Sequence, residues 1–456
     1  MTRRDLLASL AAAPALAQRR RKLPNIVLIF ADDLGSGDLS CYGHPTIRTP
    51  HLDRLAADGI RFTQFYSAAP LCSPSRAALM TGRYPVRSGI NFVLFPDSKG
   101  GLPDSELTIA QLLKQQGYAT QIVGKWHLGH LPPYLPTRHG FDHYFGIPFS
   151  NDMSLTTNVV YDEIGQKRGG KVRPPQALDR YRTLPGIPLM RDEQVLESDP
   201  DQTQLTARYT AEATGFLRKA AAANLPFFLY LAHTMPHVPL FASERFRGKS
   251  RGGPFGDAVE ELDWSVGEIR KTLAELKLEQ DTLILFTSDN GATVQLGDYG
   301  GSNGALREGK GTTWDGGYRE PFLACWKGRI PPGRVSSDVA STLDIFPTLA
   351  RLASATAPKD LVLDGRDLAP LLWESTGRPQ ADFFYYHAGA LHGMRRGPWK
   401  LRFPNPAQPE KVELYHLESD VAERFNVAAH HADLVAQMRD AIATHQAGFQ
   451  PAVTQR

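Results

Sequence analysis

Four largely apolar runs of five or six residues occur along the first two thirds of the chain. They are Asn25–Phe30, Tyr118–Val123, Phe227–Leu231 and Thr282–Thr287. A short continuous apolar run, bounded by polar residues, is typical of a strand that is buried on both faces. The pattern therefore predicts four strands in the interior of a sheet that other elements cover.

Segments with helical character lie between these runs. We expect helices at 49–59, 108–117, 203–223 and 257–276. The first has clear start signals, with Thr49 as the capping residue and Pro50 in the first turn. Alternation of strands and helices predicts an α/β fold with a mostly parallel central sheet flanked by helices. Ligands in such sheets bind beyond the carboxyl ends of the strands.

The pattern changes after about residue 372. Short strands separated by turns are expected at 383–386, 399–403 and 412–415, followed by a helix from about Ala432. This part of the chain predicts a small antiparallel α+β domain at 373–456, packed on a main domain at 23–372. The polar, proline-rich segment 165–200 is interpreted as a long surface excursion.

Composition describes an ordinary globular protein. Hydrophobic residues make up 42% of the 456 residues and charged residues 22%, which excludes a disordered chain or a collagen. The three cysteines, Cys41, Cys72 and Cys325, are too few for a disulfide framework. A hydrophobic core must therefore hold the fold together.

The amino terminus has the features of an export signal. Arg3-Arg4 precedes an uncharged stretch from Leu6 to Ala17 that is too short to span a bilayer, and small residues stand at positions 15 and 17. We expect a twin-arginine signal peptide at 1–17, cut after Ala17, and a basic linker at 18–22. The alternative is an N-terminal helix with basic flanks.

An exported protein of this kind would cross the membrane already folded, through the twin-arginine translocase. We therefore expect a periplasmic or secreted bacterial protein with no stable membrane anchor. The net charge of +3 is concentrated in residues 1–22, where six basic residues face only Asp5. Because the remainder of the chain is slightly acidic, a nucleic-acid partner is not expected.

Titratable side chains directly follow all four predicted strands. Asp32-Asp33 and Asp289-Asn290 each end a buried run, and either pair alone is also explained as a turn or a helix cap. Together they offer only oxygen ligands, which suit Ca²⁺ or Mg²⁺ better than Zn²⁺. We expect a divalent cation here to offset the repulsion between the carboxylates. Lys125 with His127, and His233 with His237, follow the other two strands.

The segment Cys72–Gly82 predicts a short helix with a cysteine at its start. Pro74 suits the first turn and Gly82 ends the helix, so that Cys72 lies at an N-terminus that favours anions, with Arg76 one turn further on. A buried structural cysteine is the simplest alternative. A thiolate phosphatase needs its arginine at the sixth position after cysteine, where Ala78 stands.

These residues resemble the type I sulfatase family. Cys72-x-Pro74-Ser75-Arg76, continuing to Arg83, resembles its first signature, and Gly117–Gly129 resembles its second. Further similar segments lie at 32–43, 140–142, 236–239, 288–291, 309–321 and 413–417. The resemblance covers about residues 23–430, and the run 227–321 is most similar to arylsulfatase A and N-acetylgalactosamine-6-sulfatase.

The resemblance implies an alkaline-phosphatase-like core at 23–372 as the catalytic domain. It also implies that a formylglycine-generating enzyme oxidises Cys72 to Cα-formylglycine before export. The metal is then Ca²⁺ rather than Mg²⁺, and the family pattern places it on Asp32, Asp33, Asp289 and Asn290, with residue 72 beside it as a further ligand.

The resemblance further assigns roles in a two-step reaction. One hydroxyl of the hydrated formylglycine attacks sulfur, and the second then expels sulfate. His127 corresponds to the base that drives this elimination, and His237 to the leaving-group acid, with Lys310 alongside. The cationic residues that would offset charge on sulfate are Arg76, Lys125 and Lys310. Ser150 corresponds to a substrate-binding residue. His233 is expected next to the residues that bind the substrate.

Three other functions remain open from the sequence. A phosphonate monoester or phosphodiester hydrolase could use the same formylglycine, although the match around His237 and Lys310 favours a sulfatase. A non-catalytic binder of sulfated glycans would result if Cys72 were not modified, and a metal-dependent phosphatase would use Cys72 unchanged. The substrate is either an aryl sulfate or a sulfated carbohydrate. The segments 83–101 and 165–200 and the C-terminal domain are expected to determine which.

Overall fold

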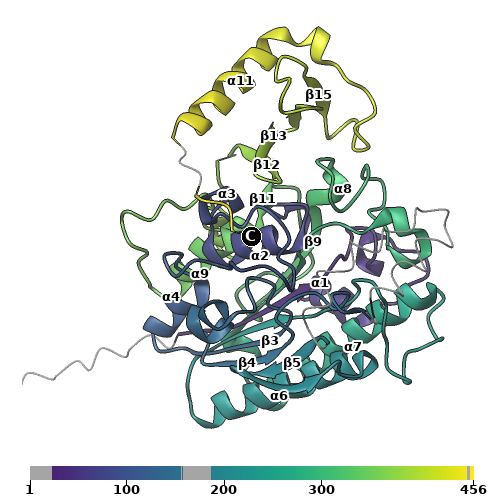
Figure 1. Cartoon of the computed structure of the whole chain (residues 1–456), viewed down its shortest axis with the longest axis vertical. Helices are drawn as coiled ribbons and strands as arrows, with labels where there is room; N and C mark the ends of the chain where they lie inside the picture. Colours follow the sequence, from purple (N-terminus) through teal and green to yellow (C-terminus); the bar gives the residue numbers. More distant parts are fainter. Residues whose placement is uncertain (1–22, 156, 158–185, 380, 449–451, 456) are drawn as a thin grey trace, which may run out of the picture.

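The computed structural model describes residues 23–155, 157, 186–379, 381–448 and 452–455. Its main body contains an eleven-stranded sheet in the order β10-β2-β9-β8-β1-β7-β3-β4-β5-β6, with β11 also paired to β2. Helices cover both faces of this sheet (Figure 1). The expected α/β fold is therefore confirmed.

Five adjacent parallel strands form the centre of the sheet. They are β8 (Thr282–Ser288), β1 (Asn25–Ala31), β7 (Phe227–Ala232), β3 (Ala119–Gly124) and β4 (His143–Gly146). Four of them are the strands predicted from the apolar runs. Every residue of β1, β7 and β8 is buried, as expected for strands covered on both faces. The parallel arrangement brings their carboxyl ends to one edge.

The flanking strands were not among those predicted. They are β2 (Ile60–Tyr66), β9 (Arg319–Cys325), β10 (Arg334–Ser336), β11 (Ala340–Ser341), β5 (Pro188–Arg191) and β6 (Gln194–Ser198). Strand β9 runs antiparallel to both β8 and β2. Polar residues interrupt β2 and β9, so neither reads as one continuous apolar run.

The segment 165–200, interpreted as a surface excursion, forms regular structure in its described part, where β6 is exposed along its whole length and β5 is partly buried. Strands β5 and β6 form a hairpin that extends the sheet beyond β4. Asp199 closes it, because its carboxylate accepts a hydrogen bond from the Ile187 backbone N–H at 2.7 Å. Leu189 is fully buried against the core. Residues 165–185 lie outside the described part of the chain.

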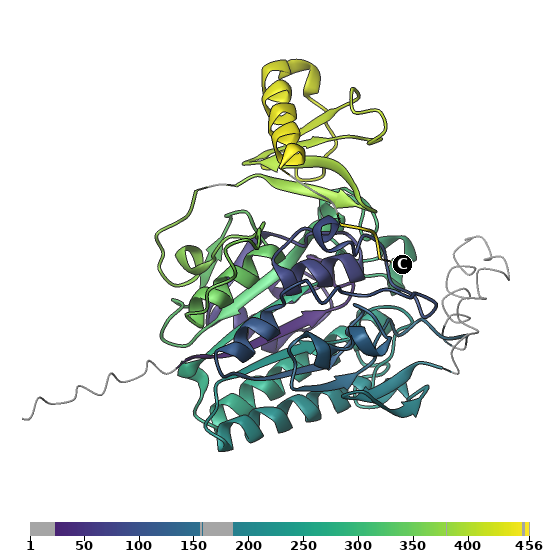
Figure 2. The same ribbon diagram turned by 60° about the vertical axis from the view of Figure 1, so that its left-hand side comes forward.

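Alternate residues of β1 face two different helical layers. Ile26, Leu28 and Phe30 pack in the core under α2, α4 and α9, whereas Val27 and Ile29 pack in the core under α1, α6 and α7. Figure 2 shows α6 and α7 together along one side of the sheet. The helices are α1 (Pro50–Ala57), α2 (Cys72–Thr81), α3 (Pro85–Ser88), α4 (Ile109–Gln115), α6 (Leu205–Ala222), α7 (Gly253–Glu275), α8 (Asp315–Tyr318), α9 (Ile345–Leu352) and α10 (Ala369–Leu372).

A smaller antiparallel sheet lies at one end of the molecule (Figures 1 and 2). It consists of β12 (Phe383–His387), β13 (Ala390–Arg396), β14 (Trp399–Arg402) and β15 (Glu413–His416), and α11 (Ala432–Ala447) follows it. Three strands and the helix were expected; β13 was not. Phe383 and Tyr385 share a core with Tyr66 and Tyr318 of the main body. The boundary at residue 372 stays a prediction.

Residues 1–22 lie outside the described part, so the signal peptide and the basic linker also stay predictions.

Within the described residues, no helix combines the length and the apolar character that a bilayer crossing requires. Cys41, Cys72 and Cys325 are free thiols.

Candidate active site

The carboxyl ends of four central strands place the predicted site residues together. Asp32 and Asp33 follow β1, Lys125 and His127 follow β3, His233 and His237 follow β7, and Asp289 and Asn290 follow β8. All eight are buried. The start of α2 reaches the same strand ends, because Cys72 and Arg76 contact Asp32 and Asp289.

Cys72 is the first residue of α2 and is 2% exposed. Its Sγ atom lies 3.8 Å from Oδ1 of Asp32. Gly82 ends the helix as expected, in the left-handed conformation with φ of 67°. Burial raises the pKa of the Cys72 thiol to about 12.

Arg76 and Lys125 neutralise two of the carboxylates. Arg76 donates from Nε and Nη2 to Oδ2 of Asp289, at 3.2 and 2.9 Å, and its Nη2 lies 3.6 Å from Asp32. Lys125 Nζ donates to Oδ2 of Asp32 at 2.5 Å. Burial would raise the pKa of Asp32, but the charges of Lys125, His237 and Arg76 hold it below its ordinary value. Burial and the neighbouring Asp32 raise the pKa of Asp289.

Asp33 connects the remaining parts of the site. Its backbone has φ of 62°, and its carboxylate accepts from Asn290 Nδ2 at 2.7 Å, from Thr293 Oγ1 at 2.9 Å and from Lys310 Nζ at 2.8 Å. His237 Nε2 lies 3.6 Å away. Thr293 was missed by sequence reasoning; only its position three residues after Asn290 could have indicated it.

Lys310 reaches Asp33 from a loop that packs closely on its surroundings. A Cβ atom at Gly309 would lie 2.1 Å from the carbonyl oxygen of Ala292, so only glycine fits there. Gly311 has φ of 78°, and its backbone N–H donates to the carbonyl oxygen of Pro70. The two glycines that flank Lys310 therefore allow the close approach that the sequence suggested.

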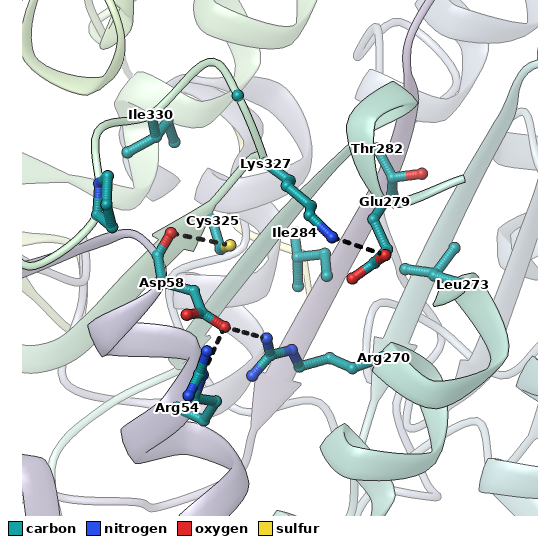
Figure 3. A pocket seen from close by; sticks show the side chains of 12 residues that line it. Arg54, Asp58, Arg270, Leu273, Glu279, Thr282, Ile284, Cys325, Lys327 and Ile330 are labelled. Atoms are coloured by element: carbon teal, nitrogen blue, oxygen red, sulfur yellow. Dashed lines mark hydrogen bonds and ion pairs between the residues drawn. The ribbon is translucent and has the colours of Figure 1, made fainter. Parts of the chain in front are cut away.

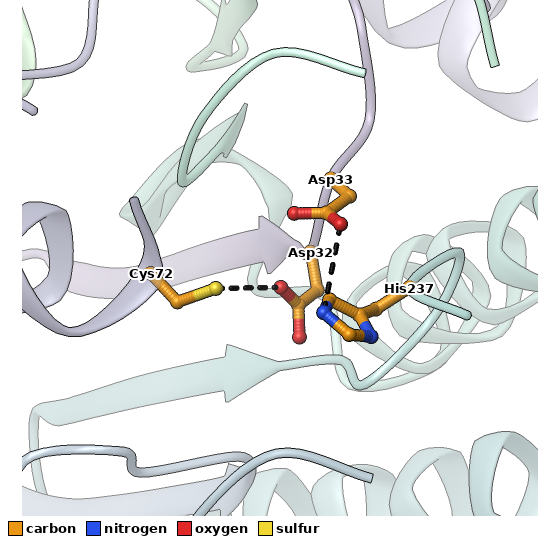
Figure 4. Close-up of side chains that lie close together, drawn as sticks. All are labelled: Asp32, Asp33, Cys72 and His237. Carbon is orange, nitrogen blue, oxygen red and sulfur yellow. Dashed lines mark hydrogen bonds and ion pairs between the residues drawn. The ribbon is translucent and has the colours of Figure 1, made fainter. Parts of the chain in front are cut away.

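The cluster can hold a hard cation. Ligand atoms of Asp32, Asp33, Cys72 and His237 lie within 4.8 Å of one another, and Figure 4 shows these side chains converging. Within the described residues, the buried Oδ1 atom of Asn290 has no hydrogen-bond partner. An unpartnered amide oxygen beside carboxylates fits a Ca²⁺ or Mg²⁺ ligand set.

The charge argument for that ion needs correction. The sequence suggested that the carboxylates require a cation to offset their repulsion. In the structure Arg76, Lys125 and Lys310 already contact Asp32, Asp33 and Asp289, so three positive charges face three negative ones. A divalent ion would therefore leave the site with an excess positive charge, which is the electrostatic requirement for binding an anion.

The two candidate acid–base histidines have defined proton positions. Nε2 of His127 lies 2.9 Å from the carbonyl oxygen of Leu94, which can only accept, so Nε2 carries the proton. Nδ1 is buried, without a hydrogen-bond partner in the described chain, and presents a lone pair. Burial, with Lys125 and Arg76 nearby, lowers the pKa of His127 well below its ordinary value. His237 Nδ1 likewise faces the carbonyl oxygen of Val238, so Nε2 is its free nitrogen.

Ser150 and His233 differ in how they join the cluster. Ser150 Oγ accepts a hydrogen bond from Lys125 Nζ at 3.0 Å, which places it in the site. Both ring nitrogens of His233 are buried and lack a hydrogen-bond partner among the described residues, and burial lowers its pKa to about 3. A substrate contact of either residue stays a prediction.

A cavity of about 430 Å³ lies at the other end of β8, where Thr282 begins the strand (Figure 3). Its charged groups pair with one another: Asp58 contacts Arg54 and Arg270, and Lys327 contacts Glu279. None of the predicted site residues lines it. This cavity therefore lies apart from the predicted active site.

Comparison with known proteins decides the family. The model of the sulfatase family matches residues 24–355, which is most of the chain. The chain belongs to the sulfatase family. It is 42% identical to human arylsulfatase A over 451 residues, covering 93% of this chain and 86% of the human protein.

Two further sulfatases extend the comparison. N-acetylgalactosamine-6-sulfatase of Canis lupus familiaris is 42% identical over 418 residues, covering 87% of this chain and 75% of that protein. The crystal structure of the PsFucS1 sulfatase from Pseudoalteromonas sp. superimposes with a TM-score of 0.82 at 28% identity, covering 94% and 91% of the two chains.

These findings confirm three of the expectations drawn from the sequence. The family is the one that the two signatures indicated, and the fold is alkaline-phosphatase-like. This sulfatase is an enzyme, a sulfuric ester hydrolase.

Proposed function

We propose that this enzyme hydrolyses sulfate monoesters to an alcohol and inorganic sulfate, using a formylglycine made from Cys72 and a Ca²⁺ ion. The observation that carries the proposal is the balance of three carboxylates against Arg76, Lys125 and Lys310 around residue 72. With a divalent cation added, this buried site attracts an anion such as a sulfate ester.

Asp32, Asp33, Asp289 and Asn290 would hold the ion, next to residue 72. When present, the hydrated formylglycine supplies a hydroxyl nucleophile and a second hydroxyl for releasing sulfate, and Ca²⁺ supplies Lewis-acid stabilisation of the sulfate oxygens. The unpartnered Oδ1 of Asn290 supports this ligand set.

The cationic side chains are held in place before substrate arrives. Arg76 is fixed by two bonds to Asp289 and one from Nη1 to the carbonyl oxygen of Lys125 at 3.1 Å. Lys125 is fixed between Asp32 and Ser150. Fixed donors of this kind stabilise developing negative charge without having to reorganise during the reaction.

Two histidines are suited to move protons in opposite directions. Nδ1 of His127 has a lone pair and can accept a proton at the sulfate-release step. Nε2 of His237 lies on the side of Asp33 and Lys310. When the ring carries a proton on both nitrogens, Nε2 can donate its proton to the departing alcohol oxygen. Lys310 adds positive charge beside that oxygen.

For the substrate we propose an aryl sulfate or a sulfated carbohydrate. Support comes from the relatives, which are named arylsulfatase A and N-acetylgalactosamine-6-sulfatase. The charge balance suits a phosphonate monoester or a phosphodiester equally well, so these compounds belong in the test. A non-catalytic binder of sulfated glycans is the outcome if residue 72 stays cysteine.

The test begins with protein made together with a formylglycine-generating enzyme. Mass spectrometry of the peptide across Cys72 should show a loss of about 18 Da, since oxidation of the thiol replaces sulfur by oxygen and removes two hydrogens. The modified enzyme should then hydrolyse p-nitrophenyl sulfate much faster than phenyl phosphonate, and C72A should be inactive. Faster hydrolysis of the phosphonate, or activity of protein that contains only the thiol, would contradict the proposal.

We also propose that the protein is exported after modification, through the twin-arginine translocase, to the periplasm or the medium. The support is the Arg3-Arg4 pair and the small residues before position 18. N-terminal sequencing of exported protein should begin at Gln18. Retention in the cytoplasm of a bacterium with an active translocase would contradict this.

A further inference from the structure

A buried ion network joins the C-terminal sheet to the main body. Lys400 of β14 is 1% exposed, and its Nζ lies 3.0 Å from Oδ1 of Asp315 and 2.6 Å from Oε1 of Glu423. Tyr385 donates to the same Asp315 oxygen at 3.1 Å, and Tyr66 donates to the other one at 2.7 Å. Asp315 begins α8 of the main body, so the cation nearest to its carboxylate comes from the neighbouring sheet.

Cations of both parts contribute to this network: Arg319 of β9, in the main body, also lies 3.9 Å from Oδ2 of Asp315. Arg395 of β13, also 1% exposed, donates to Tyr66 and Gln64 and provides the second buried cation. Lys400 contacts a carboxylate of each part, Asp315 of the main body and Glu423 of the C-terminal part. A buried charge without its partner is strongly destabilising. Loss of Lys400 would leave Asp315 with only the more distant Arg319 and would remove the cation that lies 2.6 Å from the Glu423 carboxylate.

The helix α8 contacts the backbone of three segments that form the active site. The carbonyl oxygen of Gly317 accepts from the N–H of Gly291, next to Asn290, at 3.3 Å. The carbonyl oxygen of Tyr318 accepts from the N–H of Ser67, five residues before Cys72, at 2.7 Å. The N–H of Gly316 donates to the carbonyl oxygen of Arg307, three residues before Lys310, at 2.9 Å.

The backbone of α8 packs directly against the backbone of these segments, with no room for side chains between them. A Cβ atom at Gly291 would lie 1.7 Å from the carbonyl oxygen of Gly316, and one at Gly316 would lie 2.1 Å from that of Glu308. A displacement of α8 must therefore also move the segment that carries Asn290 or the loop that carries Lys310.

The C-terminal part also holds both ends of the Lys310 loop. At its start, Arg307 Nη1 donates to the carbonyl oxygen of Glu423 at 2.6 Å. At its end, Arg402 donates to Thr313 at 3.1 Å, and its guanidinium carbon lies 3.9 Å from the ring centre of Trp314. The Glu423 carboxylate accepts from the Asp315 N–H at 2.7 Å.

We propose that Lys400 is a positioning residue of the active site, which fixes α8 and thereby the Lys310 loop through Asp315 and Glu423. The inference rests on the sulfatase reaction proposed above. Lys400 does not touch the reacting groups in this scheme. Lys400 therefore affects the reaction only through the placement of Lys310 beside the departing alcohol oxygen.

The test replaces Lys400 by the apolar side chain of similar length, K400M. Because Lys310 is placed where it assists the leaving group, kcat should fall by about 100-fold on phenyl sulfate but only about tenfold on p-nitrophenyl sulfate, whose phenolate needs less assistance. A general loss of folded enzyme would lower both rates equally. The formylglycine content is measured for each variant, and rates are divided by it.

Two further variants keep the test decisive. K400M/E423Q removes one charge of each sign, so it keeps the network balanced if K400M alone fails to fold, and it should retain the leaving-group-dependent loss. R396M is the matched control, because Arg396 pairs with Asp382 within the C-terminal part at 2.5 Å rather than with α8. It should have wild-type rates on both substrates.

Hydrogen exchange supplies a readout that does not need activity. In K400M the amides of 307–318 and 289–291 should exchange faster than in wild type, while those of β7 stay unchanged. If the folded Lys400 variants show wild-type exchange there and equal rate ratios on both substrates, the positioning role is wrong. If wild type containing formylglycine hydrolyses neither sulfate, the proposed function fails, and the exchange result still decides whether Lys400 holds α8.

Discussion

The guanidinium of Arg76 donates two hydrogen bonds to a single oxygen of Asp289, from Nε at 3.2 Å and from Nη2 at 2.9 Å. Its third nitrogen donates to the carbonyl oxygen of Lys125 at 3.1 Å. One side chain of α2 thus fixes the ends of both β8 and β3 relative to Cys72. A lysine ammonium cannot reproduce this fork.

The R76K variant should therefore keep the positive charge at this position but lose the hydrogen bonds that fix Asp289 and the end of β3. We expect kcat/KM for p-nitrophenyl sulfate to fall by about 100-fold or more, the usual cost of losing a preorganised charge-stabilising donor. The formylglycine content of R76K must be measured first, since Arg76 lies within the segment to be modified. R61K, on the part-buried Arg61 of β2, is the control. A fully modified R76K with wild-type kcat/KM would contradict the role of this geometry.

Asn290 should matter more for metal binding than for folding. Its Oδ1 is the buried oxygen left without a protein partner in the described site. N290A removes that oxygen, and we expect Ca²⁺ affinity, measured by calorimetry on metal-free protein, to fall by about 10- to 100-fold. N25A alters another buried asparagine, at the opposite end of β1, and should leave Ca²⁺ affinity unchanged. Equal affinities in both variants would remove Asn290 from the ligand set.

Much of the site could be predicted because it depends on strand ends. Asp32, Lys125, His237 and Asp289 each follow a buried run, and parallel strands bring such positions to one edge whatever their order. Signature segments then located Cys72 without any structure. These features are local in sequence, so periodicity and motif reading capture them.

The parts that escaped prediction depend on long-range pairing. Strand β9 runs antiparallel between β8 and β2, and no local pattern indicates that direction. The contact of Lys400 with Asp315 joins residues 85 positions apart, and neither residue has a distinctive neighbourhood in the sequence. The proton position on His127 likewise depends on the carbonyl oxygen of Leu94, a backbone group that any residue would supply.

His127 should act after the alcohol has left. In H127A the first turnover needs only the leaving-group side of the site, whereas sulfate release lacks its base. We expect a burst that releases one p-nitrophenol per formylglycine-containing enzyme molecule. The steady-state rate that follows should be about 100-fold lower than that of wild type. Rapid-mixing absorbance measurements would show it. Equal loss in burst and steady state would place His127 in the first step instead.

His139 should make the folded protein sensitive to mild acid. It is fully buried, both ring nitrogens lack partners among the described residues, and its ring lies 5.8 Å from that of Trp126. Burial lowers its pKa from 6.5 to about 4, although Asp104 opposes this shift. The unfolded chain thus binds a proton below pH 6.5 that the folded protein excludes until about pH 4, and stability falls as pH decreases through that interval.

H139F removes this proton uptake. Between pH 7 and pH 5 the free energy of unfolding of the wild type should fall by about 2 kcal/mol more than that of H139F. This value follows from the difference between the pKa of His139 in the unfolded chain and in the folded protein. Urea unfolding at both pH values measures it, with H430F at an exposed position as the control that should match the wild type. Because every other titrating group is shared, a difference of zero between wild type and H139F would mean that His139 is solvated or paired in the folded protein.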